Sequence, residues 1–77
     1  MMNLIIVTRH GNCVNMAFSA GIMHEEDTIT YLRRDGEELF TEEYESPEDM
    51  QNDLEFIHRA LRQKAWLVDL NQVTMRI

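Results

Sequence analysis

A single amphipathic helix is the feature of this sequence that most limits how the chain can fold. Its apolar side chains recur three or four positions apart and so share one helical face, at Met50, Leu54, Ile57 and Leu61. Ser46 can cap the first free N–H groups, and Pro47 suits the first helical position. The sequence therefore predicts a helix from Pro47 to about Lys64.

The other apolar residues form short runs of the kind found in strands. These runs cover 4–8, 14–19, 28–32, 38–42 and 65–70, with 73–77 as an extended tail or short strand. Asp35-Gly36 favours a tight hairpin between the third and fourth runs. Since a lone helix must cover a sheet, we predict an α+β fold in one domain, 1–77. It comprises an antiparallel sheet of four to five strands with one helix on one face, in the order β-β-β-β-α-β.

Charge and composition narrow the classes of partner. The net charge of −7 disfavours direct binding to nucleic acid and to anionic membranes, since both need Lys and Arg. No apolar run approaches the roughly 20 residues that span a bilayer. Cys13 is the chain's one cysteine, so no internal disulfide can form. These features favour a cytoplasmic protein.

One short motif bears on catalysis. Arg9-His10-Gly11 follows an apolar strand and resembles the signature of the histidine phosphatase superfamily. The resemblance implies that His10 is a phosphorylated nucleophile and that Arg9 binds the phosphate. Those enzymes are far larger α/β domains that draw a second histidine and further arginines from distant segments. Because 77 residues cannot hold that fold, we predict no enzymatic activity.

The residues that could bind a metal are sparse. His10 and Cys13 form one His-x-x-Cys pair, whereas His24 and His58 stand alone. A structural zinc site normally uses four ligands in two close pairs. We therefore predict no metal site, and no glycine-rich loop indicates a nucleotide cofactor.

The charge is strongly segregated along the chain. No acidic residue precedes Glu25, and only Asp69 follows Glu55, whereas 35–55 contains many acids and no Lys, Arg or His. The short acidic cluster 25–27 is expected to be a solvated connection. In a strand that leads into a helix, carboxylates at such spacings form a strip of negative potential, as a nucleic-acid backbone does.

The leading hypothesis is a small acidic inhibitor, a nucleic-acid mimic that blocks a basic nucleic-acid-handling protein or complex. Such compact acidic chains are typical of phage proteins for host takeover, including anti-CRISPR proteins. The predicted partner contacts are the acids of the strip and one aromatic anchor, namely Glu38, Glu42, Glu43, Tyr44, Glu45, Glu48, Asp49, Asp53 and Glu55.

Three alternatives remain open. A self-associating module could form a homodimer through an apolar patch of Trp66, Val68, Leu70 and the tail to Ile77. An antitoxin that neutralises a basic toxin would use the same acidic surface. The acidic strip could also serve solubility alone.

Overall fold

The computed structural model describes residues 4–77, apart from the side chains of residues 18–20. The described elements follow one another as β1 (Ile5–Val7), β2 (Cys13–Asn15), the 3₁₀ turn η1 (Met16–Phe18), β3 (Ser19–Glu25), β4 (Thr28–Arg33), β5 (Glu38–Glu43), α1 (Pro47–Arg62), β6 (Leu67–Asp69) and β7 (Thr74–Arg76). The predicted α+β class is confirmed.

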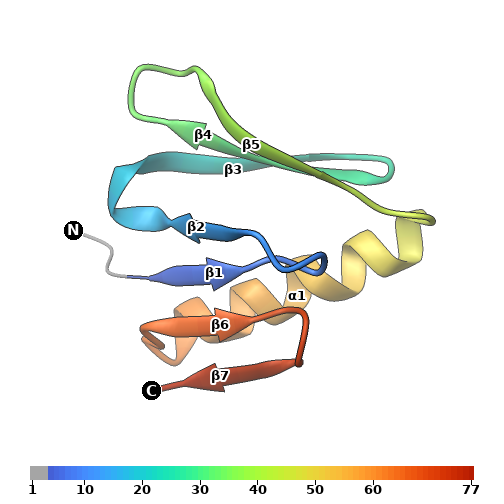
Figure 1. Ribbon diagram of the computed structural model, residues 1–77. Coiled ribbons are helices and arrows are strands. Elements are labelled where there is room, and N and C mark those ends of the chain that lie inside the picture. The colour runs from blue at the N-terminus through green and yellow to red at the C-terminus, as the bar shows by residue number, and fades with distance from the viewer. Residues whose placement is uncertain (1–3) are drawn as a thin grey trace.

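The strands form two sheets (Figure 1). One has four strands in the order β2-β1-β6-β7, and the other has three in the order β3-β4-β5. All pairs are antiparallel except β1 and β6, which run parallel with Ile5 opposite Leu67. The sheet arrangement thus differs from the single antiparallel sheet that the sequence favoured, and the predicted hairpin of β4 and β5 is confirmed.

A local turn explains why the chain divides into two sheets. The sequence predicted one strand over 14–19, but η1 interrupts it after Asn15. The side-chain carbonyl of Asn15 accepts a hydrogen bond from the backbone N–H of Ala17 at 2.9 Å. Asparagine often bonds to the backbone two residues ahead, and this contact favours a turn over an extended chain. The chain therefore leaves the first sheet and begins the second.

The helix begins where the sequence predicts. Ser46 is extended (φ −147°, ψ 153°), and its side chain accepts a hydrogen bond from the N–H of Asp49 at 3.2 Å. The helix ends at Arg62, slightly before the predicted end. Lys64 has a left-handed backbone (φ 58°), and the N–H of Ala65 closes the last turn on the carbonyl of Ala60 at 2.9 Å.

The apolar face of α1 and the inner faces of both sheets enclose one core (Figure 1). Ile6 and Val68 come from the first sheet, Ile29 from the second and Ile57 from the helix, and all four are fully buried. No described helix is long and apolar enough to cross a membrane.

The N-cap gives a test of this helix start. Replacing Ser46 with Ala removes the acceptor for the Asp49 N–H and should lower the free energy of unfolding by about 1 kcal/mol. Ser46→Asp keeps a capping oxygen and should unfold close to wild type. Urea titration followed by circular dichroism measures both variants, and an unchanged midpoint for Ser46→Ala would contradict the capping role.

Candidate functional site

Two consecutive residues after β1, Arg9 and His10, contact buried carboxylates on other elements of the fold. The Arg9 guanidinium donates two hydrogen bonds to the Asp53 carboxylate on α1, from Nε and from Nη2, each at 3.1 Å. It also lies over the Tyr44 ring, 5.4 Å from the ring centroid. The paired hydrogen bonds to Asp53 raise the pKa of Arg9. This contact fixes the end of β1 against the helix.

His10 makes a second contact of this kind, to β5. Its Nδ1 lies 3.1 Å from Oε2 of Glu42, and its backbone N–H donates to Oε1 at 3.1 Å. The Glu42 side chain is 5% exposed, whereas that of His10 is 60% exposed. Burial acts to raise the pKa of Glu42, but hydrogen bonds from His10 and Thr8 outweigh it, so this pKa is lowered. Glu42 is therefore a buried carboxylate held in its charged form.

Two tyrosines lie beside these carboxylates. The hydroxyls of Tyr31 and Tyr44 are buried, and neither has a hydrogen-bond partner of good geometry in the described part of the chain. Burial raises the pKa of both phenols, and the nearby charges of Glu42 and Asp53 raise it further. Both tyrosines therefore remain neutral and contribute rings to the core.

The structure separates the predicted contact residues into two groups. Glu42, Tyr44 and Asp53 are buried, with 4%, 6% and 6% of their surface exposed, so we leave them out of the predicted contact surface. Glu42 lies opposite Ile29 on the inner face of β5, and Asp53 falls on the buried face of α1. The sequence did not indicate that Glu42 and Asp53 are buried, because acidic residues occupy both faces of the strand and of the helix start in this run.

The other predicted contacts are at the surface, but not all together. Glu43, Glu45, Glu48 and Asp49 surround the junction of β5 and α1. Glu38 lies at the far end of β5 and accepts a 2.6 Å hydrogen bond from the Thr41 hydroxyl. Glu55 is exposed further along α1.

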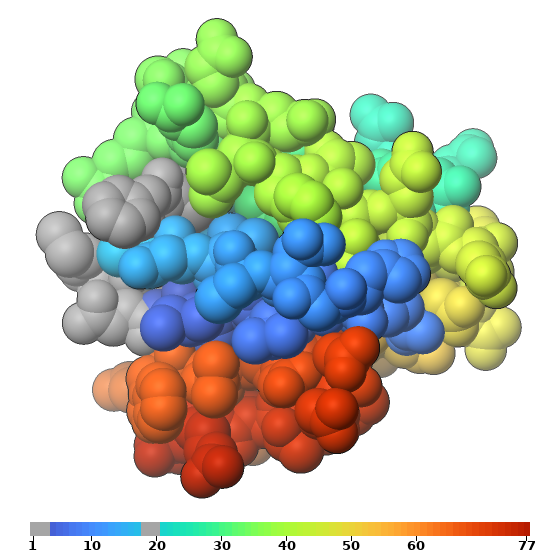
Figure 2. All heavy atoms as spheres, viewed as in Figure 1, coloured from blue at the N-terminus to red at the C-terminus, as the bar shows by residue number. Residues whose placement is uncertain are grey.

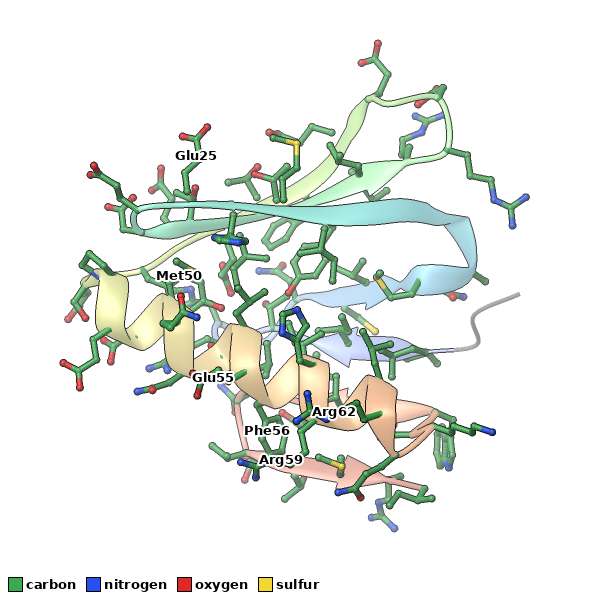
Figure 3. All side chains as sticks on the ribbon, turned by 180° about the vertical axis from the view of Figure 1, so that it is seen from behind. Glu25, Met50, Glu55, Phe56, Arg59 and Arg62 are labelled. Carbon is green, nitrogen blue, oxygen red and sulfur yellow. The ribbon has the colours of Figure 1, made fainter. Side chains whose placement is uncertain are left out.

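The fold brings a second acidic segment to this junction. The N–H of Tyr44 donates to the carbonyl of Asp27 at 2.8 Å, which places the β3–β4 turn beside the end of β5. Glu25, next to this turn, and Met50, in the early part of α1, lie at the same end of the molecule (Figure 3). We define the acidic end as the carboxylates gathered there, namely Glu25, Glu26, Asp27, Glu43, Glu45, Glu48 and Asp49.

The sequence analysis missed the first three members of the acidic end. It treated 25–27 as a solvated connection, since they stand apart from the acidic run along the chain. The pairing of β4 with both β3 and β5 places Glu25 and Glu43 on either side of Thr28. A β-hairpin of β3 and β4, with its turn at Glu26 and Asp27, is the pattern that could have placed them there.

A small pocket lies between the acidic end and the contacts that Arg9 and His10 make with the buried carboxylates. It has a volume of about 200 Å³ and is lined by Arg9, His10, Tyr44, Glu45 and Asp49. Among the described residues, no three or more of His, Cys, Asp and Glu are placed to hold a metal ion. The pocket is thus lined by groups of both charges, with the basic ones already paired to buried carboxylates.

Comparison with known proteins adds no assignment. No protein-family model, no curated protein and no solved structure matches this chain. The functional argument therefore rests on the geometry and charge of the described residues.

The lowered pKa of Glu42 predicts a pH-dependent contribution to stability. A carboxylate with a depressed pKa stabilises the fold above its unfolded pKa of about 4.3, and this contribution is lost as the pH falls through the folded pKa. Glu42→Gln should therefore cost about 1–2 kcal/mol of unfolding free energy at pH 7. The difference from wild type should shrink as the pH falls below about 4.

Urea titrations at several pH values measure this difference. Glu43→Gln is the matched control, because Glu43 is the next residue on the same strand and is exposed. It should change stability by less than about 0.5 kcal/mol. A cost for Glu42→Gln that is the same at pH 3 and pH 7 would contradict a charged, hydrogen-bonded Glu42.

Proposed function

We propose that this protein acts by binding a basic surface of a nucleic-acid-handling protein through its acidic end, as an inhibitor that mimics the charge of nucleic acid. The observation that carries the proposal is the meeting of two acidic segments, distant in sequence, at one end of the fold. Fixed carboxylates on a strand end, a turn and a helix start present closely spaced negative charge on a rigid support.

The location of the cations also supports this proposal. Arg9 is the cation that borders the acidic end, and it is bound to the buried Asp53. The charge of Arg9 is thereby compensated from the interior, and the surface carboxylates keep their net negative field. A negative surface of this kind steers association with a basic partner and suppresses binding to acidic ones.

The contact set that we propose is smaller than the one that the sequence predicted, and some of its members differ. It comprises the seven carboxylates of the acidic end. Glu42, Tyr44 and Asp53 support this surface from inside, and Glu38 and Glu55 lie away from it. An anti-CRISPR role is one form that such inhibition could take.

Charge reversal tests the proposal. Capture from a nuclease-treated lysate of the source organism, with identification by mass spectrometry, should recover a nucleic-acid-binding protein. Raising salt from about 0.1 M to about 1 M shortens the Debye length from about 10 Å to about 3 Å and should release that protein. The double variant Glu45→Lys, Glu48→Lys should lose capture at low salt.

A second double variant is the matched control. Glu37→Lys, Glu55→Lys makes the same change in net charge at exposed positions outside the acidic end. It should retain capture, and both variants should keep the wild-type circular dichroism spectrum. Equal loss of capture by the two variants would show that net charge, and not the acidic end, governs binding.

A second candidate function is self-association at the open edge of the four-stranded sheet. β7 is the edge strand there, and Trp66, Val73 and Ile77 near it are 51%, 67% and 74% exposed. Val68 and Leu70, which the sequence assigned to this patch, are fully or almost fully buried and belong to the core. An exposed edge strand with apolar neighbours favours pairing with a second copy.

Sedimentation equilibrium separates the two candidates. The acidic-end proposal requires no contact between copies and therefore predicts a monomer at micromolar concentration, in low salt and in high salt. Self-association predicts a dimer that persists in high salt and that Trp66→Lys dissociates. A salt-resistant dimer of wild-type protein would favour the second candidate over the first.

A further inference from the structure

A shallow groove lies between β2 and the first half of β5. Figure 2 shows the face on which these two segments, blue and yellow-green, lie next to each other. It has a volume of about 370 Å³, and its lining comprises Asn12, Cys13, Val14 and Asn15 on one side and Leu39 and Phe40 on the other. β2 is an edge strand of the four-stranded sheet, and β5 is an edge strand of the three-stranded sheet. The groove therefore lies between two strand edges.

The hydrogen-bond pattern of β2 directs backbone groups toward the groove. The N–H of Thr8 donates to the carbonyl of Asn12, and the N–H of Met16 donates to the carbonyl of Leu4. In an antiparallel pair, alternate residues bond to the partner strand, so the backbone groups of the residues between them point the other way. Those of Cys13 and Asn15 consequently point away from β1.

The edge of β5 has the same property. The N–H of Tyr44 bonds to the carbonyl of Asp27, and the register places Glu42 opposite Ile29 two positions further along. By the same alternation, the backbone groups of Thr41 and Glu43 point away from β4. On β2 the outward groups belong to Cys13 and Asn15, which line the groove, and on β5 the nearest belong to Thr41, which follows the lining residue Phe40.

The side chains of the groove suit an alternating peptide. Val14 is buried and Phe40 is half-buried, so they form an apolar floor continuous with the core. Cys13, Asn15 and Leu39 are exposed at the rim. The four lining residues 12–15 extend about 13 Å at about 3.4 Å per residue, which accommodates three or four residues of an extended chain.

Charge selects among such peptides. The exposed charged side chains of β5 are Glu38 and Glu43, whereas the β2 side of the groove has no charged residue. A segment that places apolar side chains on the floor and Lys or Arg side chains outward would match this arrangement. Peptides that add a strand to a sheet edge gain affinity from main-chain hydrogen bonds and specificity from alternate side chains.

We propose that the groove between β2 and β5 binds an extended basic-apolar peptide segment of the partner, which pairs as an added strand. The inference rests on the proposed function only for the basic character of the partner. The argument from the two strand edges and the apolar floor does not depend on the acidic end.

A peptide titration of the full-length, ¹⁵N-labelled protein tests this site. The probe is a capped peptide with alternating lysine and valine, and the readout is the change in backbone amide signals. We expect saturable shifts centred on Cys13, Asn15 and Thr41. A peptide with glutamate in place of lysine, and one N-methylated at alternate residues, should each bind at least about tenfold more weakly, a difference of about 1.4 kcal/mol.

Cys13 offers a second measurement, since it is exposed at the rim of the groove. Alkylation of Cys13 with iodoacetamide should weaken peptide binding by at least about tenfold. The matched control is Cys13→Ser, which removes the reactive thiol and keeps the size of the side chain. After the same iodoacetamide treatment, this variant should bind the peptide as well as unmodified wild-type protein does. Equal binding by alkylated and unmodified wild-type protein would overturn the site.

The outcomes distinguish this inference from the proposed function. Peptide shifts confined to the acidic end, or equal binding of the N-methylated peptide, would overturn the groove and leave the acidic-end proposal standing. Peptide binding in the groove by the Glu45→Lys, Glu48→Lys variant, together with undiminished capture of the partner, would retain the groove and remove the acidic end as the contact surface.

Discussion

The fold depends on two buried carboxylates that are bound by consecutive residues of the chain. Arg9 and His10 follow β1 and bind Asp53 on α1 and Glu42 on β5. The two sheets share no interstrand ladder among the described residues, so their relative position depends on the core and on these contacts. Both carboxylates are buried, and removing the groups that bind them would leave a buried carboxylate with too few partners, which is costly in an apolar interior.

This arrangement divides the acidic residues of the chain by function. Glu42 and Asp53 connect separate elements from the interior, whereas the carboxylates of the acidic end lie at the surface, with Asp49 half-buried. A net charge of −7 would otherwise oppose the compact state through repulsion. Because Arg9 and the hydrogen bonds from His10 stabilise the two buried carboxylates from inside, the remaining acids can gather at the surface of one end.

The three surfaces described above follow from the division into two sheets. A single continuous sheet would have two edges, whereas two sheets have four, and β2 and β5 face each other across the groove. β7 forms the outer edge of the first sheet, and the β3–β4 turn of the second sheet contributes to the acidic end. The short turn that begins after Asn15 therefore determines much of the surface available for binding.

Local signals in the sequence determined the helix, its cap at Ser46 and the hairpin of β4 and β5, because these depend on neighbours a few residues apart. The tertiary structure alone decided the parallel pairing of β1 with β6, the burial of Glu42 and Asp53, and the approach of Asp27 to Tyr44. These contacts join segments far apart in the chain. Strand pairing and burial choose among many such partners by the packing of the whole core, which the spacing of residues along the sequence does not encode locally.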